Sequence, residues 1–354
     1  MAAHPSGHAP STRRHSLKRW HPYLGEWVII APATSGRPWN GAVIDTAVPD
    51  TPAFDPGCYL CPGVVRASGE QNPAYEGVYI FTNDFASLSH EPDDMASLSG
   101  GDHPARGLCR VVCFSPRHNE TLPVMSGPAV TNVLHTLAEE YRRLSALPGI
   151  AQVMIFENRG KIIGVSNPHP HGQIYCTDFV PRMQLAMYRN ALDHRREHGE
   201  CLFCRVLAEE LADGSRIVTE NDHAVAFVPP FARHAFEVHL MPRRHVPAMT
   251  DLDSEEMDGF AALFHEMQIR FDNLFAMPFP NITIFQNPPR GDEFDLTPCH
   301  FRIEFYPPLR SPDKLKYMAG FESGGGNIVN PALPDESAAA LRETSTTHYT
   351  RRKP

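Results

Sequence analysis

The segment PHPHGQIY at residues 168–175 combines strand-forming residues with two closely spaced histidines. Alternate side chains of a strand share one face and lie about 6.6 Å apart, so His169, His171 and Gln173 are predicted to point the same way. Gly172 allows a bulky group to approach the backbone closely. This strand is therefore the first place to look for positioned, reactive side chains.

The order of elements around this segment occurs twice along the chain. The first series consists of expected strands at 78–81, 110–114, 153–158 and 168–175 and a helix after Pro128. The second consists of expected strands near 224–228, 236–245, 282–287 and 299–306 and a helix over 257–274. Side-chain identities recur as well, since Ile-Phe-Glu-Asn at 155–158 is matched by Ile-Phe-Gln-Asn at 284–287. Such short strands predict an α+β fold, a duplicated unit with a mainly antiparallel sheet and helices packed on it.

The duplication also predicts the domain boundaries. We expect a flexible basic tail at 1–19, one half at 20–198, the second half at 199–345 and a tail at 346–354. With 42% hydrophobic and 21% charged residues, the 354-residue chain has the composition of a globular protein with a sizeable core.

Each half begins with a Cys-x-x-Cys pair, which in a reducing compartment indicates metal or redox chemistry. Aligning the halves adds two histidines to each pair, so the ligand sets are Cys58, Cys61, His118 and His169, and Cys201, Cys204, His245 and His300. Zinc suits four nitrogen and sulfur ligands in a closed tetrahedron, which has no open position for catalysis. The sequence therefore predicts two structural zinc sites, with His239 and His234 as alternatives to His245.

Charge and hydropathy narrow the classes of partner. The formal net charge is −9 and the pI is near 6.1, which argues against a nucleic-acid partner and against a zinc-ribbon module. No apolar run reaches the roughly 18 residues of a membrane span. The first 20 residues lack the apolar stretch of a secretory signal. We expect a cytoplasmic protein that acts on neither nucleic acid nor membrane.

His171 is the candidate reactive group. An imidazole with a pKa near 6.5 is largely neutral at pH 7 and offers one nitrogen lone pair. If a backbone carbonyl accepts a hydrogen bond from the far nitrogen of His171, the near nitrogen becomes a nucleophile. The second half has Arg302 at the equivalent position, so metal binding does not require a histidine there. A zinc-stabilised nucleotide-binding protein without catalysis would not need this oriented imidazole.

The segment GVSNPHPHGQ at 164–173 resembles the signature of the galactose-1-phosphate uridylyltransferase family, in the histidine-triad superfamily. Further matches between about residue 20 and residue 345 are GEWV (25–28), RPW (37–39), FTNDF (81–85), CFSP (113–116), FEN (156–158), FYPP (305–308) and KYMAGFE (316–322).

The resemblance implies a duplicated histidine-triad-like unit and a two-step exchange through a covalent UMP–His171 intermediate. UDP-glucose would give up glucose 1-phosphate, and galactose 1-phosphate would then take the uridylyl group. Gln173 and Ser166 would donate hydrogen bonds to phosphoryl oxygens. The other implied contacts are Arg37 for phosphate, Asn83, Asp84 and Asn158 for the nucleotide, and Lys316 and Glu322 for the sugar phosphate. Family members form homodimers whose active sites borrow residues across the interface.

The chain departs from the family pattern at several positions. It has Tyr175 where the family has Trp, no second Arg within 33–36, and no Gln within 323–327. Where some relatives carry a His-x-His iron site, it has Arg302 and Glu304, so we expect the second cysteine set to replace that site. The substrate therefore stays open. The rival hypothesis is a nucleotide-sugar phosphorylase or related nucleotidyltransferase that uses the same histidine intermediate with another base, sugar 1-phosphate or acceptor.

Overall fold

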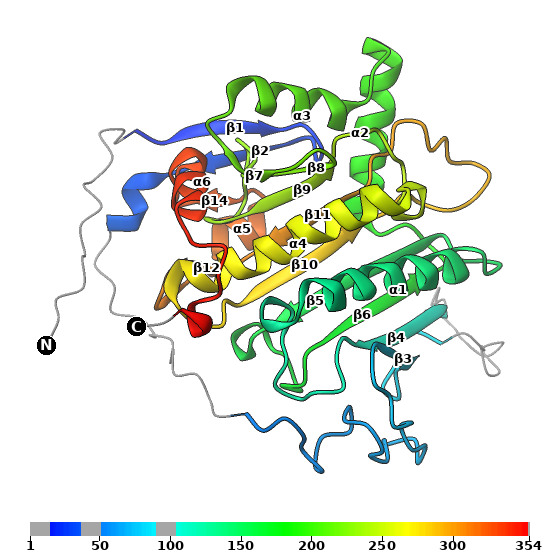
Figure 1. Ribbon diagram of the computed structural model, residues 1–354. Helices are drawn as coiled ribbons and strands as arrows, with labels where there is room; N and C mark the ends of the chain where they lie inside the picture. The colour runs from blue at the N-terminus through cyan, green and yellow to red at the C-terminus, as the bar shows by residue number, and fades with distance from the viewer. Residues whose placement is uncertain (1–14, 37–50, 90–103, 353–354) are drawn as a thin grey trace, which may run out of the picture.

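The computed structural model describes residues 15–36, 51–89 and 104–352. Its centre is a nine-stranded, wholly antiparallel sheet (Figure 1). In spatial order the strands are β3 (Tyr79–Thr82), β4 (Gly107–Cys113), β6 (His171–Thr177), β5 (Gln152–Arg159), β10 (Asn281–Gln286), β11 (Arg302–Tyr306), β9 (Val238–Pro242), β8 (Ala224–Phe227) and β7 (Ile217–Glu220). The predicted α+β class with a mainly antiparallel sheet is confirmed.

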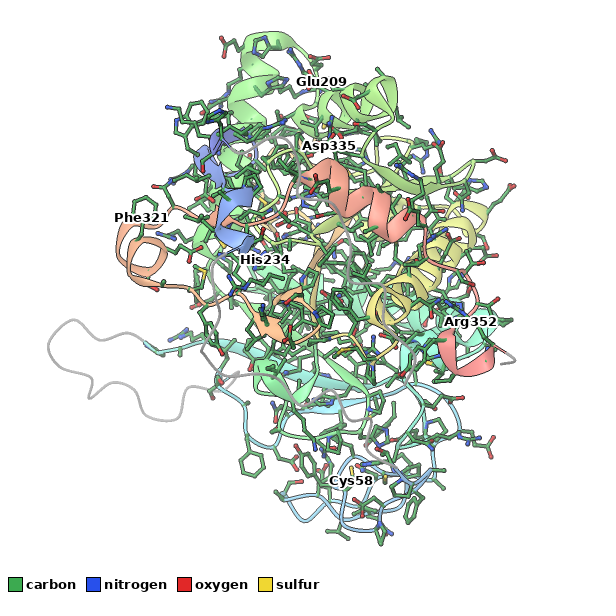
Figure 2. All side chains as sticks on the ribbon, turned by 90° about the vertical axis from the view of Figure 1, so that its left-hand side faces the viewer. Cys58, Glu209, His234, Phe321, Asp335 and Arg352 are labelled. Atoms are coloured by element: carbon green, nitrogen blue, oxygen red, sulfur yellow. The ribbon has the colours of Figure 1, made fainter. Side chains whose placement is uncertain are left out.

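The strand order shows the duplication directly. β5 and β10 lie side by side at the centre, and outward from them β6 matches β11, β4 matches β9 and β3 matches β8. Helices α1 (Gly127–Ser145) and α4 (Ser254–Phe275) lie next to each other across one face of the sheet (Figure 1). In the view turned by 90°, Cys58 and Glu209 lie near opposite ends of the molecule (Figure 2).

Both covering helices follow the expected periodicity. In α1 the apolar positions Val130, Val133, Leu134, Leu137, Tyr141 and Leu144 are all buried. The Ser126 hydroxyl caps the first turn by accepting from the Ala129 amide. In α4, Asp253 and Glu256 form a reciprocal capping box. The main core fills the space between these helices and the sheet.

The remaining elements lie around this two-layer body. The strands are β1 (Leu17–His21), β2 (Glu26–Ile30), β12 (Leu309–Ser311), β13 (Lys314–Leu315) and β14 (Val329–Asn330). The helices are α2 (Arg182–His198), α3 (Leu202–Asp213), α5 (Gly320–Gly325) and α6 (Pro334–Arg342). Short 3-10 helices are η1 (Pro32–Gly36), η3 (Leu122–Val124), η4 (Lys161–Ile163), η5 (Met249–Asp251) and η6 (Tyr349–Arg351). No helix in the described ranges combines the length and apolar character that crossing a bilayer demands.

When the two halves are aligned by strand pairing, the Ile-Phe-Glu-Asn and Ile-Phe-Gln-Asn segments are offset by one residue. Gln173 and Glu304 each follow the metal-cluster histidine of their half by four residues, and their strand partners are Phe156 and Ile284. Phe156 therefore corresponds to Ile284 and not to Phe285. Because a one-residue shift exchanges the two faces of a strand, Phe285 packs in the helix-covered core, while Phe156 contacts Tyr175 on the other face.

Parts of the two expected tails belong to the fold. Residues 17–19 form the start of β1. Near the other end, His348 is buried and its Nε2 lies 3.1 Å from a carboxylate oxygen of Asp272 on α4. The Arg159 guanidinium of β5 donates two hydrogen bonds to the same carboxylate, at 2.7 and 2.8 Å. This buried contact fastens the C-terminal segment to the central strands.

Candidate functional site

The first predicted metal cluster is assembled. Cys58 and Cys61 lie in the loop before β3, His118 follows β4, and His169 precedes β6. Their ligand atoms lie within 4.8 Å of one another. The Cys61 Sγ is 3.6 Å from His118 Nδ1 and 3.5 Å from His169 Nδ1. Tetrahedral zinc, with Zn–S near 2.3 Å and Zn–N near 2.0–2.1 Å, places sulfur and nitrogen about 3.6 Å apart. The buried donor set fits a closed tetrahedral ion.

Neighbouring groups orient the His169 ligand. Its Nε2–H donates to the Ser115 carbonyl at 2.9 Å, so the Nδ1 lone pair is left for a metal. Burial lowers the pKa of His169 to about 4, which keeps the ring neutral. The Asn167 side-chain oxygen accepts from the His169 backbone N–H at 2.9 Å. Asn167 carries no predicted role, although an Asn side chain commonly accepts a hydrogen bond from the backbone N–H two residues later in a turn.

The second cluster has the same construction. The Sγ of Cys204 lies 3.3 Å from His245 Nδ1 and 3.4 Å from His300 Nδ1, and Cys201 completes the set. His245 follows β9 and His300 precedes β11, the positions that match those of the first cluster. Of the two proposed alternatives to His245, His239 pairs through Nε2 with Glu237 at 3.1 Å, and His234 Nδ1 lies 3.5 Å from the same carboxyl group. Neither belongs to the cluster.

His171 is held in the tautomer that leaves Nε2 free. Its Nδ1 lies 2.7 Å from the His169 carbonyl oxygen, which can only accept, so Nδ1 carries the proton. Burial lowers the pKa of His171 below its usual value, although this hydrogen bond opposes the effect. The half-buried imidazole is therefore neutral near pH 7, with its lone pair on Nε2. This is the arrangement of a nitrogen nucleophile.

β6 begins at His171, and not at residue 168 as the sequence suggested. His169 is fully buried in the metal cluster, while His171 and Gln173 are half-buried on one face of the sheet. The predicted strand alternation thus applies to His171 and Gln173, because His169 lies before the strand. Pro168 and Pro170 flank His169 and cannot donate to a strand ladder, which fits the start of β6 at His171.

The candidate nucleotide contacts lie near this strand. Asn158 follows Phe156, the strand partner of Gln173, by two residues and so shares its face. Asn83 and Asp84 form the turn after β3, where the Asn83 side-chain oxygen accepts from the Phe85 amide at 2.9 Å. Ser166 is exposed in the loop before His169. Arg37 lies outside the described residues.

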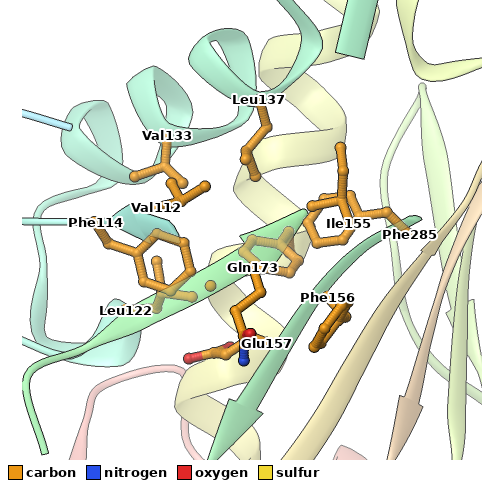
Figure 3. Close-up of a pocket in the computed structure, with 12 residues that line it drawn as sticks. Val112, Phe114, Leu122, Val133, Leu137, Ile155, Phe156, Glu157, Gln173 and Phe285 are labelled. Atoms are coloured by element: carbon orange, nitrogen blue, oxygen red, sulfur yellow. The ribbon is translucent and has the colours of Figure 1, made fainter. Parts of the chain in front are cut away.

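A small cavity lies under β6, between the sheet and the covering helices (Figure 3). Its lining is mainly apolar and includes Val133 and Leu137 of α1. The buried carboxyl group of Glu157 also lines it, and burial raises the pKa of Glu157 to about 7. A Cβ on Gly172 would lie 2.9 Å from the Phe114 ring. Phe114 is thus the bulky group that approaches the backbone at Gly172, as the sequence predicted.

The side chains of Lys316 and Glu322 make no hydrogen bond or ion pair to β6 in the described part of the chain. The two residues form an ion pair. Glu322 also accepts from the amides of Ala319 and Val329 at 3.1 and 3.0 Å. These partners all lie between residues 316 and 329.

The matching face of the second half carries no such site. A row of paired residues crosses each half, namely Phe156, Gln173, Val111 and Phe81 in the first and Ile284, Glu304, His239 and Phe227 in the second. In that second row Glu304 accepts from Arg302 Nε at 2.6 Å and from Gln286 at 2.7 Å. Although burial opposes it, the Arg302 guanidinium holds the pKa of Glu304 at about 2. An ion pair therefore occupies the place of the reactive imidazole.

The chain itself also covers this second face. Phe231, four residues after Phe227, is 3% exposed and packs against His21 and Tyr23 at ring distances of 4.4 and 5.1 Å. Phe85, four residues after Phe81, is 72% exposed. Among the described residues, the exposed ring at this position and the oriented imidazole occur together in the first half.

Comparison with known proteins agrees with this geometry. Residues 8–181 match the family model of the galactose-1-phosphate uridyl transferase N-terminal domain, and residues 188–353 match that of its C-terminal domain. The galactose-1-phosphate uridylyltransferase of Haemophilus influenzae is 36% identical over 342 residues, covering 96% of this chain and 97% of the relative. The enzyme of the same name from Rattus norvegicus is 34% identical over 344 residues, covering 95% and 89%.

Solved structures show the same fold. A uridylyltransferase structure superimposes with a TM-score of 0.73 at 28% identity, covering 92% of this chain and 97% of that one. An ADP-glucose phosphorylase from Arabidopsis thaliana with bound ADP-glucose gives a TM-score of 0.75 at 22% identity, covering 94% and 99%. At that identity the second likeness concerns the fold alone.

Proposed function

We propose that this chain, which belongs to the galactose-1-phosphate uridylyltransferase family, transfers a uridylyl group from UDP-glucose to galactose 1-phosphate. The observation that carries the proposal is the 2.7 Å hydrogen bond from His171 Nδ1–H to the His169 carbonyl, which leaves Nε2 as a nucleophile. A binding protein would have no use for a histidine in this defined tautomer.

The chemistry balances without a net proton transfer. His171 Nε2 forms a bond to the α-phosphorus, and the bond from that phosphorus to the bridging oxygen breaks, so glucose 1-phosphate leaves with the electron pair. The imidazole keeps its Nδ1 proton and becomes positively charged, and the His169 carbonyl dipole stabilises that charge. An oxygen of galactose 1-phosphate then attacks the same phosphorus, and the phosphorus–nitrogen bond breaks. UDP-galactose leaves and His171 is neutral again.

The surrounding residues bind and orient the substrates in this proposal. Gln173 and Ser166 donate to the phosphoryl oxygens, and Arg37 neutralises phosphate charge. Asn83, Asp84 and Asn158 hold the nucleotide. Lys316 and Glu322 bind the sugar phosphate. Since their own side-chain partners lie within 316–329, we propose a homodimer in which these two residues complete the partner's site.

We propose zinc at both clusters, because each offers two thiolates and two Nδ1 atoms at tetrahedral spacing. Bound metal would supply rigidity, since the His169 ligand stands two residues before the nucleophile. The eight cysteines are all free, which suits the reducing cytoplasm that we propose as the location. Metal analysis should give two zinc ions per chain, and Cys61→Ser should leave one. A single zinc ion in the parent chain would contradict the second site.

The decisive experiment is mass spectrometry after incubation with UDP-glucose. The parent chain should gain one acid-labile uridylyl group, and His171→Asn should gain none. His135→Asn, at a histidine on the exposed side of α1, is the matched control and should behave like the parent. An adduct that persists in His171→Asn would contradict the proposal.

A panel of other nucleotide sugars and sugar 1-phosphates, read by adduct mass, identifies the base and the acceptor. Preferred labelling by another base, or release of the nucleotidyl group to another acceptor, would favour the related phosphorylase or nucleotidyltransferase.

A further inference from the structure

Arg66 is a buried cation between the first metal cluster and the turn at Asn83 and Asp84. It lies five residues after Cys61, in the loop that leads to β3, and it is 6% exposed. The same loop is tied to the cluster by Asn72, whose side-chain N–H groups donate to the carbonyls of Tyr59 and Cys61 at 2.9 and 3.0 Å. A charge buried to this degree needs specific partners.

The partners of Arg66 are concentrated on the end of β3. Its guanidinium lies over the Phe81 ring, 4.3 Å from the centroid. Nη1 donates to the Thr82 carbonyl at 3.3 Å and to a carboxylate oxygen of Asp84 at 3.0 Å. Nη2 pairs with Glu70, whose side chain is 73% exposed. Thus one side chain contacts three of the four residues from 81 to 84.

Hydrogen bonds from this loop hold the Asp84 carboxylate but do not use all of its acceptor positions. One oxygen accepts from Arg66 and the other from the Ser68 amide at 3.2 Å. An ionised carboxylate has about four acceptor positions, so two are left beside these donors, on a side chain that is 9% exposed. Both known donors come from the loop that begins at the metal cluster. The position of this carboxylate therefore depends on that loop.

We propose that Arg66 is a positioning residue, which holds the Asp84 carboxylate for the nucleotide and couples the first metal-binding loop to nucleotide affinity. The inference rests on the proposed function in that Asp84 contacts the nucleotide. It acts on binding and not on the chemical step, because Arg66 reaches the substrate only through Asp84.

The test is calorimetric titration of the metal-loaded protein with UDP. Arg66→Met should raise the Kd for UDP about tenfold, the worth of one lost hydrogen bond to the ligand. Arg66→Lys keeps a charge but not the fork and the ring contact, so it should raise Kd less. Glu70→Gln, which removes only the exposed partner, should bind UDP like the parent. With UDP-glucose, Arg66→Met should raise KM by a similar factor and leave kcat within about threefold.

A double-mutant cycle with Asp84→Asn separates positioning from general damage. If Arg66 acts through Asp84, the double variant should bind UDP within about twofold of Asp84→Asn alone. Full additivity of the two effects would overturn the proposal, as would a parent-like Kd in Arg66→Met. If Arg66→Met loses the first metal, Arg66→Lys becomes the test. Parent-like UDP affinity in Arg66→Lys, measured with two metals bound, would then overturn the proposal. Because UDP binding needs no reaction at His171, these titrations stand apart from the adduct experiment.

Discussion

At the scale of single residues, two neighbouring histidines are oriented by two backbone carbonyls. The Ser115 carbonyl selects the His169 tautomer that leaves Nδ1 free, and the His169 carbonyl selects the His171 tautomer that leaves Nε2 free. The first nitrogen is available to a metal and the second to a substrate. These two hydrogen bonds link the metal cluster to His171 and fix the direction in which its Nε2 points.

Gly172, between His171 and Gln173, makes a prediction at this scale. In Gly172→Ala the new Cβ would meet the Phe114 ring at 2.9 Å and the Phe156 carbonyl oxygen at 3.2 Å, so the ring or β6 must shift. We expect a loss of about 1–3 kcal/mol in the free energy of unfolding, the usual range for overpacking. Urea denaturation measures this loss, and the rate of adduct formation should fall with it.

Gly127→Ala is the control for that experiment, because nothing lies within 4 Å of the added Cβ at the start of α1. Its stability should match or slightly exceed that of the parent. Equal stability of both glycine variants would show that the Phe114 contact relaxes freely.

At the scale of elements, the β1–β2 hairpin covers the face of the second half that corresponds to the His171 face of the first. His21 at the end of β1 packs on Phe231 and faces Glu237, His239, Glu304 and Arg233. Burial lowers the pKa of His21 to about 3, although Glu237 opposes the effect. The hairpin is therefore docked through a neutral imidazole.

This docking predicts a defined pH dependence of stability. An unfolded histidine takes up a proton near pH 6.5, whereas folded His21 does so only near pH 3. The unfolded state binds more protons in that window, so stability falls as the pH drops below about 6.5, by up to about 1.4 kcal/mol per pH unit. His21→Gln should show a shallower loss between pH 6.5 and 5, measured by urea denaturation of the metal-loaded protein. Identical slopes in parent and variant would contradict the prediction.

At the scale of the whole molecule, the duplicated sheet is symmetric in topology but not in its side chains. The strand order reads the same outward from β5 and β10, and both metal clusters occupy matching positions. His171 stands at the start of β6, the strand next to β5, whereas Arg302 stands at the start of β11, the strand next to β10.

A complementation experiment tests the proposed sharing of sites between copies. His171→Asn lacks the nucleophile and Glu322→Gln lacks the sugar-phosphate acceptor, so each homodimer should be nearly inactive. If Glu322 acts in the partner's site, mixed and reassembled dimers regain one intact site per heterodimer, about a quarter of all sites. Uridylyl transfer after co-expression measures the gain. No recovery, with heterodimers confirmed by mass, would place Glu322 in the site of its own chain.

Much of the functional centre was predictable because it depends on residue identity at short range. Residue type and spacing indicate the chemistry of the Cys-x-x-Cys pairs, of their repeated histidines and of the PHPHGQ segment. The structure brings both predicted ligand sets together, and His171 makes the expected hydrogen bond to a backbone carbonyl. The helices were predictable for a similar reason, since a 3.6-residue apolar period needs no distant partner to be recognised.

Other features were decided only by tertiary packing. Sequence likeness aligned Phe156 with Phe285, but pairing with β6 and β11 sets the register and sends the two rings to opposite faces. Arg66 carries no motif, and its importance comes from contacts with residues 15 to 18 positions away. The amino-acid sequence by itself determined which atoms could bind metal and react, because those are properties of the side chains. Tertiary structure decided on which face each of these side chains lies and which groups hold it in place, because register, burial and hydrogen bonding arise only when distant segments meet.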